Sequence, residues 1–151
     1  MAHKYCFRRA TPAHVESLAA RLRPEDFEEA RAAGVEDVHA RLLLSIAKPG
    51  DHRALIDLQS GRTLAILGAV ETDYGASPWM LCADDISRAG RFSLKHVPRW
   101  VRVWARKWGE LHNAVYARNT MHQRFIERCG FEWRGETSIN GHPFRLFAYV
   151  S

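Results

Sequence analysis

The stretch from Leu111 to Phe131, LHNAVYARNTMHQRFIERCGF, decides the fold of this chain. Its first part, Leu111–Ala117, is short and apolar, which is typical of a buried strand. Asn119 then predicts the N-cap of a helix, because its side-chain oxygen can accept from the free N–H groups of the first turn. Apolar residues follow at helical spacing up to Gly130, where a left-handed residue would end the helix. The stretch therefore predicts a strand followed directly by a capped helix.

The order of strand, Asn, helix and Gly-Phe resembles the C-terminal half of the GCN5-related N-acetyltransferase (GNAT) fold. Asn119, Gly130 and Phe131 hold the spacing of that family, with the glycine 11 positions after the asparagine. Any strand that leads into a capped helix needs similar residues, so the motif could also arise in another fold. The order of the elements elsewhere along the chain favours the acetyltransferase-like fold.

The composition indicates a globular protein. The 151 residues are 46% hydrophobic and 26% charged, and we expect a single GNAT-like domain over residues 1–151. No apolar run is long enough to span a membrane, and the start, MAHKYCFRR, lacks the apolar core of a signal peptide, so we expect a cytoplasmic protein without membrane insertion. The three cysteines are widely spaced and form no CxxC pair, so we expect neither disulfides nor a metal site.

The rest of the chain predicts elements in the order that the family shows. The sequence predicts strands at 5–9, 53–59, 63–71 and 79–83, with a loop at 74–78, and helices after Thr11, over 25–33 and over 35–47. A closing hairpin is expected around Asn140-Gly141, between strands at 132–138 and 143–150. The resemblance implies an α/β (α+β) fold. It has a mixed, mostly antiparallel sheet with a central splayed parallel pair, helices on both faces and a C-terminal β-hairpin.

The helix that follows Pro98 carries aromatic and basic residues on different faces. Trp100, Trp104 and Trp108 recur at helical spacing, while arginines line another face. Together with the formal charge of +5, this pattern could serve phosphates, nucleic acid or an acidic protein. We expect the tryptophans to pack in the core, since valines share their face, and nucleic acid is therefore not an expected partner.

The resemblance implies acetyl-CoA or CoA as cofactor, held where the two central strands diverge. In the family, the strand that corresponds to 79–83 exposes its backbone to pantetheine. The loop after it normally carries an Arg or Gln and several glycines, whose N–H groups hold the pyrophosphate. Here DDISRAGRFSLKH keeps only part of that pattern, and its two aspartates would repel a polyanion. The cofactor-binding residues expected are Leu81, Cys82, Ala83, Arg88, Gly90, Arg91, Asn119 and Phe125.

The catalytic groups of the family are incompletely matched. The family uses a general base, often a Glu, and a Tyr four residues before the closing glycine that protonates the departing thiolate. That position is Ile126 here, which cannot donate a proton. Glu71 and Asp84, at predicted strand ends, are the candidate bases, and Tyr116 and His122 are the candidate acids. Packing beside the sheet is the alternative for Tyr116, and a surface position is the alternative for His122.

A narrower resemblance concerns the segments WMLCADDISRAGR, NTMHQRFIERCGF and NGHPFRLF. They are similar to the internal virion protein A-like family of short-tailed bacteriophages. This resemblance implies a phage-encoded protein in the cytoplasm of the host cell or in the virion. Two functions stay open: an acetyl-CoA-dependent N-acyltransferase with degenerate catalytic residues, acting on a small-molecule amine or a host protein, and a catalytically inactive module that binds a host or phage protein.

Overall fold

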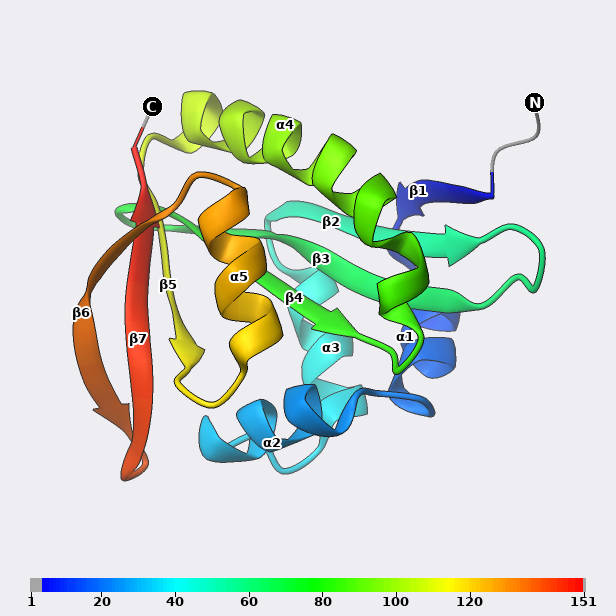
Figure 1. Cartoon of the computed structure of the whole chain (residues 1–151), viewed down its shortest axis with the longest axis horizontal. Helices are drawn as coiled ribbons and strands as arrows, with labels where there is room; N and C mark the ends of the chain where they lie inside the picture. The colour runs from blue at the N-terminus through cyan, green and yellow to red at the C-terminus, as the bar shows by residue number, and fades with distance from the viewer. Residues whose placement is uncertain (1–3, 151) are drawn as a thin grey trace.

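The computed structural model describes residues 4–150, which fold into helices packed on a β-sheet (Figure 1). Helices α1 (Pro12–Ala19), α2 (Pro24–Ala32) and α3 (Val38–Ala47) separate strand β1 (Tyr5–Arg9) from strand β2 (Gly50–Asp57). Strands β3 (Thr63–Thr72) and β4 (Gly75–Cys82) lead to the short 3₁₀ helix η1 (Ile86–Ala89) and the long helix α4 (Gly90–Trp108). Strand β5 (Leu111–Tyr116), helix α5 (Thr120–Arg128) and strands β6 (Glu132–Ile139) and β7 (His142–Tyr149) complete the fold.

The strands of residues 4–150 form one seven-stranded sheet in the order β1-β2-β3-β4-β5-β7-β6. Neighbouring strands are antiparallel, except that β4 and β5 are parallel and share a single paired position, Ala76 with Leu111. Figure 1 shows α4 and α5 on one face of the sheet, α1 and α3 on the other, and α2 along the open end of the gap between β4 and β5. The predicted fold class, with its splayed parallel pair, two-sided helices and closing hairpin, is confirmed.

Strand β4 begins earlier than the sequence predicts. The predicted loop at 74–78 is wrong, because Gly75, Ala76 and Ser77 already pair with the end of β3. Gly75 has φ +140°, and a Cβ there would collide with the carbonyl of Glu110. This close approach, which only glycine permits, is where β4 meets the start of β5. The turn-forming residues therefore mark a backbone contact inside the sheet rather than a loop.

Helix α4 also differs from its prediction, because Pro98 lies inside the helix rather than near its start. Its aromatic face packs in the core as predicted, and the indole of Trp104 is 3% exposed beside Val101 and Leu67. Gly130 ends α5 at φ +93°, as predicted. Within the described residues, no helix combines the length and the apolar character that crossing a membrane requires.

Candidate functional site

One side chain, Asn113 of β5, holds the two central strands apart. In a regular parallel ladder, the Pro78 carbonyl on β4 would accept from the N–H of Ala114 on β5. Instead, Asn113 Nδ2 donates to the Pro78 oxygen at 2.7 Å, and Asn113 Oδ1 accepts from the Ala114 N–H at 2.8 Å. Pro78 also has no N–H with which to continue the ladder. The Asn113 amide therefore replaces a ladder bond, and the strands diverge from this point.

We expect Asn113→Ala to lower the free energy of unfolding by about 1–3 kcal/mol, because it leaves the Pro78 carbonyl and the Ala114 N–H without partners. Urea unfolding of the variant and the parent protein measures the difference. His112→Ala, at a half-buried position on the same strand, is the control, with an expected change of about 0.5 kcal/mol. Equal losses at the two positions would show that the amide does not bridge the strands.

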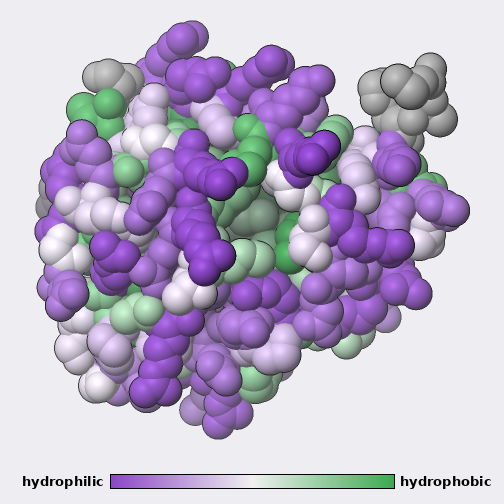
Figure 2. Space-filling view, viewed as in Figure 1, coloured by the Kyte–Doolittle hydropathy of each residue, from purple (hydrophilic) through white to green (hydrophobic). Residues whose placement is uncertain are grey.

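A cavity of about 310 Å³ passes through the gap between β4 and β5. Its walls come from α4 and α5 on one face of the sheet and from α2 and α3 on the other. Figure 2 shows a hollow near the centre of the α4–α5 face, with hydrophobic residues at its floor and hydrophilic residues around it. Its volume suits a small-molecule site. Lining side chains include Val97, Val101 and Phe125 on the first face and Val38, Leu42 and Trp79 on the second.

The backbone of β4 offers hydrogen-bond donors to this gap. The N–H of Ala76 donates to the Glu110 carbonyl across the start of the gap at 3.0 Å. Because N–H groups alternate in direction along a strand, those of Met80 and Cys82 point to the same side. The Cys82 N–H already donates to a carboxylate. Met80, which lines the cavity, therefore presents a backbone donor to its interior.

Helix α2 places the carboxylate of Asp26 in the wide part of the gap, where it is fully buried. Its Oδ2 accepts from the Cys82 N–H at 2.6 Å, and its Oδ1 accepts from Arg23 Nη1 at 2.8 Å and from Asn119 Nδ2 at 3.0 Å. His122 Nε2 lies 3.3 Å from the same Oδ1. Burial raises the pKa of Asp26, but His122, Asn119 and Arg23 outweigh burial and hold that pKa below its usual value. A charged Asp26 therefore links α2 to β4 and α5.

One helical turn after Asp26, the partly buried Glu29 reaches the other side of the gap. Its Oε1 accepts from the Tyr116 N–H, at the end of β5, at 2.9 Å and from Asn119 Nδ2 at 3.3 Å. Burial raises the pKa of Glu29, and the charge of Asp26 adds to the rise, which His122 and the two hydrogen bonds offset only in part. Glu29 also lines the cavity. A carboxyl group with a raised pKa beside a cavity is suited to accept a proton.

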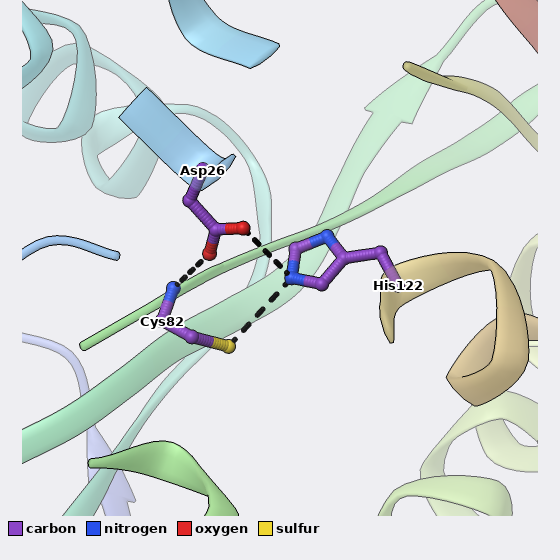
Figure 3. A group of neighbouring side chains, drawn as sticks. All are labelled: Asp26, Cys82 and His122. Carbon is purple, nitrogen blue, oxygen red and sulfur yellow. Dashed lines mark hydrogen bonds and ion pairs between the residues drawn. The ribbon is translucent and has the colours of Figure 1, made fainter. Parts of the chain in front are cut away.

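The thiol of Cys82 completes a buried cluster with Asp26 and His122 (Figure 3). Its Sγ lies 3.8 Å from His122 Nε2, and burial together with the charge of Asp26 raises the pKa of the thiol well above its usual value. These residue types can bind zinc. However, the Asp26 oxygen that faces His122 already accepts from Arg23 and Asn119, and the guanidinium would repel a metal ion. The cluster fits an ion-paired network better than a metal centre, and its neutral thiol is a poor nucleophile.

The predicted phosphate-binding residues lie around the N-terminus of α4. Gly90 is the first helical residue, with an ordinary φ of −58°, and a Cβ added there would meet no atom within 4 Å. Arg88 and Arg91 are exposed close to it. Asp85 pairs with Arg21 at 3.2 Å, which offsets part of its repulsion toward an anion. An open helix start beside two arginines is compatible with a bound phosphate. However, η1 occupies most of the segment where the family resemblance implies a glycine-rich loop.

The four candidate catalytic residues do not come together. His122 lines the cavity and is buried, so the surface position considered for it is wrong. Tyr116 is buried against Phe144, with ring centroids 5.3 Å apart, as its packing alternative expects. Glu71 and Asp84 are exposed near the ends of β3 and β4, and in the described part of the chain neither lines the cavity. Of the four, His122 is the one with access to the cavity interior.

The residues expected to bind the cofactor also divide. Leu81 and Phe125 line the cavity. Cys82 and Ala83 are fully buried, the first bonded to Asp26 and the second paired with Leu22. Asn119 is the N-cap residue of α5, as predicted, but the expected capping hydrogen bond is wrong, because the side chain makes none to the first turn of the helix. Its amide is instead oriented by the two carboxylates of α2.

Sequence reasoning missed Asp26, Glu29 and Asn113. Helix α2 carries glutamates at exposed positions as well, so its acidic composition does not reveal which carboxylates turn inward. The spacing of Asp26, Glu29 and Ala33 places them on one helical face, and this was the available signal. Asn113 gave none, since a polar residue in a half-buried strand is ordinary.

The comparisons with known proteins give matches to solved structures. No family model matches the sequence, and neither does any curated protein. A spermidine N-acetyltransferase from Vibrio cholerae, solved with CoA and spermine, matches with a TM-score of 0.68 and 13% identity over 97% of this chain and 95% of that chain. A GCN5-related N-acetyltransferase from Brucella melitensis matches with a TM-score of 0.69 and 14% identity over 99% of this chain and 77% of that chain. An acetyltransferase of the GNAT family from Streptococcus pneumoniae matches with a TM-score of 0.67 and 14% identity over 97% of this chain and 98% of that chain.

At these identities the similarity concerns the fold. It spans nearly the whole chain and agrees with the single parallel pair of strands and the gap between them. The chain therefore has the GCN5-related N-acetyltransferase fold.

Proposed function

We propose that this protein is an acyltransferase that moves an acyl group, with acetyl as the first choice, from a CoA thioester to an amine. The observation that carries the proposal is the cavity through the gap between β4 and β5. Because it reaches both faces of the sheet, donor and acceptor can meet inside it from opposite sides. The Vibrio cholerae neighbour was solved with CoA and spermine, which supports this pair of substrate classes.

The chemistry follows from groups that border the gap. The amine nitrogen forms a bond with the thioester carbonyl carbon, the carbon–sulfur bond breaks, and a proton passes from the amine to a base. The Met80 N–H is our candidate donor to the carbonyl oxygen as negative charge develops there. Glu29, with its raised pKa, is our candidate for the base. Arg88, Arg91 and the start of α4 would hold the phosphates.

The departing thiolate needs a proton or a stabilising charge. Ile126, at the family's tyrosine position, supplies neither, although it lines the cavity. His122 is our candidate donor, since it lines the cavity and sits one turn into α5. Orientation of the two reactants can supply several kcal/mol even where such an acid works poorly.

Binding of acetyl-CoA is the first test. A ligand that binds only the folded protein should stabilise it by about 2.7 kcal/mol at 100 times Kd, which raises Tm by several degrees. Gly90→Glu should remove this rise by placing a negative side chain at the open start of α4. Ala40→Glu, at an exposed position on α3, adds the same charge on the other face and should leave the rise unchanged.

The absence of a rise in Tm at millimolar acetyl-CoA would contradict the proposal. A rise that survives in Gly90→Glu would show instead that the phosphates bind elsewhere. Acyl transfer itself is measured separately, as thiol released from acetyl-CoA in the presence of an amine.

The second candidate is a catalytically inactive binding module with the same fold. Asp26 supports it, because this carboxylate occupies the Cys82 N–H that would otherwise face a ligand in the gap. The loss of most of the glycine-rich loop supports it too. Such a module would bind acetyl-CoA weakly or not at all, and would instead engage a host or phage protein.

The resemblance of three segments to a phage virion family supports a more specific proposal about origin. We propose that the protein is phage-encoded and acts in the cytoplasm of the infected cell or is carried in the virion. Mass spectrometry of purified particles and of infected-cell lysate distinguishes these two places. Absence from both would contradict this proposal and leave the enzymatic one standing.

A further inference from the structure

The part of the cavity on the α2–α3 face is apolar, and this limits which amine can enter. Apart from the Ser45 hydroxyl on α3, its uncharged walls are mainly small and branched aliphatic side chains and one indole, which belong to Ala30, Ala33, Val35, Val38, Leu42 and Trp79. Ala33 and Arg41 are exposed as well as lining, so the cavity reaches solvent between α2 and α3. An acceptor that enters from this side must therefore give up its water to hydrocarbon.

Two charged side chains border this apolar region. Glu29 lies beside the gap, where its Oε1 accepts from the Tyr116 N–H. Arg41 lines the cavity from α3 and is exposed to solvent. Among the described residues that line the cavity, Glu29 is the one carboxylate. A single ammonium group can pair with Glu29, and a second positive charge would meet either hydrocarbon or the Arg41 guanidinium.

Those two surroundings are unfavourable for a polycation. A desolvated ion without a partner costs several kcal/mol even after relaxation, and a like charge adds repulsion. A spermidine molecule with one nitrogen at the gap would have to pass its next charged nitrogen along these walls and beside Arg41 on the way to solvent. An alkyl or aryl body, in contrast, would gain free energy by leaving water for these walls. The lining therefore favours one charge on an apolar body.

We infer that the acceptor is a primary amine with a single positive charge and an apolar alkyl or arylalkyl body, and not a polyamine. This inference rests on the proposed acyl transfer, because it places the amine at the α2–α3 side of the same cavity. It separates this protein from the Vibrio cholerae neighbour, whose structure contains spermine.

The test compares 2-phenylethylamine with spermidine as acceptors. Thiol release from acetyl-CoA gives kcat/KM for each amine, and the rise in Tm with each amine in the presence of CoA gives binding without turnover. We expect kcat/KM to be at least about tenfold higher for 2-phenylethylamine, which corresponds to about 1.4 kcal/mol. The rise in Tm should follow the same order.

Two variants locate the effect. Arg41→Glu should raise kcat/KM for spermidine about tenfold, because it replaces a repulsive charge with an attractive one. The kcat/KM for 2-phenylethylamine should change by less than about threefold. Arg102→Glu, at an exposed position on α4, makes the same charge change on the other face of the sheet and should change kcat/KM for neither amine. Ala33→Trp should weaken the binding of both amines, because the larger side chain would fill the entrance. The rise in Tm caused by acetyl-CoA should stay unchanged.

The outcomes separate the two proposals. Stabilisation by acetyl-CoA with equal or better use and binding of spermidine would overturn the acceptor inference and leave acyl transfer standing. No stabilisation by acetyl-CoA would overturn the proposed function and the inference with it. Stabilisation by acetyl-CoA with the expected order of amines, reversed in part by Arg41→Glu alone, would support both.

Discussion

Glu29→Gln is expected to lower kcat/KM for acyl transfer by about 10²–10⁴-fold, the usual contribution of a general base. The substitution removes the proton acceptor and keeps an Oε1 oxygen for the Tyr116 N–H and the Asn119 amide. The loss should therefore appear in an otherwise folded protein. Steady-state kinetics on the variant and on Glu28→Gln, an exposed position of the same helix, measures it.

The pH dependence gives this prediction a second readout. Because the pKa of Glu29 is raised, kcat/KM of the parent protein should rise with pH until the pH passes that raised value, and this limb should vanish in Glu29→Gln. The stability of the parent should fall as pH rises from the ordinary glutamate pKa through the raised one, since the folded state holds that proton more tightly. Glu29→Gln should thus be no less stable at pH 7. Unchanged kinetics in this variant would remove Glu29 as the base.

Asp26→Ala is expected to lower the free energy of unfolding by about 3–5 kcal/mol, because it removes one partner from a buried network of charges. The Cys82 N–H, the Asn119 amide and the Arg23 guanidinium would each lose an acceptor. Urea unfolding at pH 7 measures the loss. Glu28→Ala, an exposed acid on the same helix, should change stability by no more than about 0.5 kcal/mol.

The change of unfolding free energy with falling pH gives a second test of the same network. The pKa of Asp26 is lower in the folded state, so its stabilisation is fully present above the ordinary aspartate pKa of about 3.9 and is lost as pH falls through the lower folded value. The stability of Asp26→Ala should lack this acid-dependent part. If Asp26→Ala does not fold, Asp26→Asn keeps the shape and one acceptor oxygen and gives the same comparison. A loss no larger than that of Glu28→Ala would show that the network does not stabilise the fold.

The fold was predictable from sequence where the signals are local. The strand and helix of 111–131 need only an apolar run, a polar start and a terminal glycine, and Gly130 takes the left-handed backbone that this predicts. The closing hairpin follows from Asn140 and Gly141, which both have positive φ, as its two-residue turn requires. The start of β4 failed because Gly75 and Pro78 resemble a turn in sequence, while their role depends on β5.

The site was less predictable because its contacts are distant in sequence. Asp26 bonds to Cys82 across 56 positions and to Asn119 across 93. Apart from its spacing to Glu29 and Ala33, nothing in the local sequence distinguishes Asp26 from the exposed acids of α2. Asn119 shows the same limit, since its local context predicts a helix cap and the buried carboxylates of α2 orient its amide otherwise. Only the fold brings these groups to one gap.

The single backbone pairing between Ala76 and Leu111 has a mechanical consequence. Within residues 4–150, strands β1–β4 and strands β5–β7 are each continuous ladders, and one paired position joins them. Cohesion along the midline therefore depends on side chains: the Asn113 amide near the closed end and the two α2 carboxylates at the open end. Helix α2 therefore joins the two halves of the sheet at the open end, beside a core cluster around Trp104 and Leu111 that packs across both, so a change in α2 would act on both halves at once.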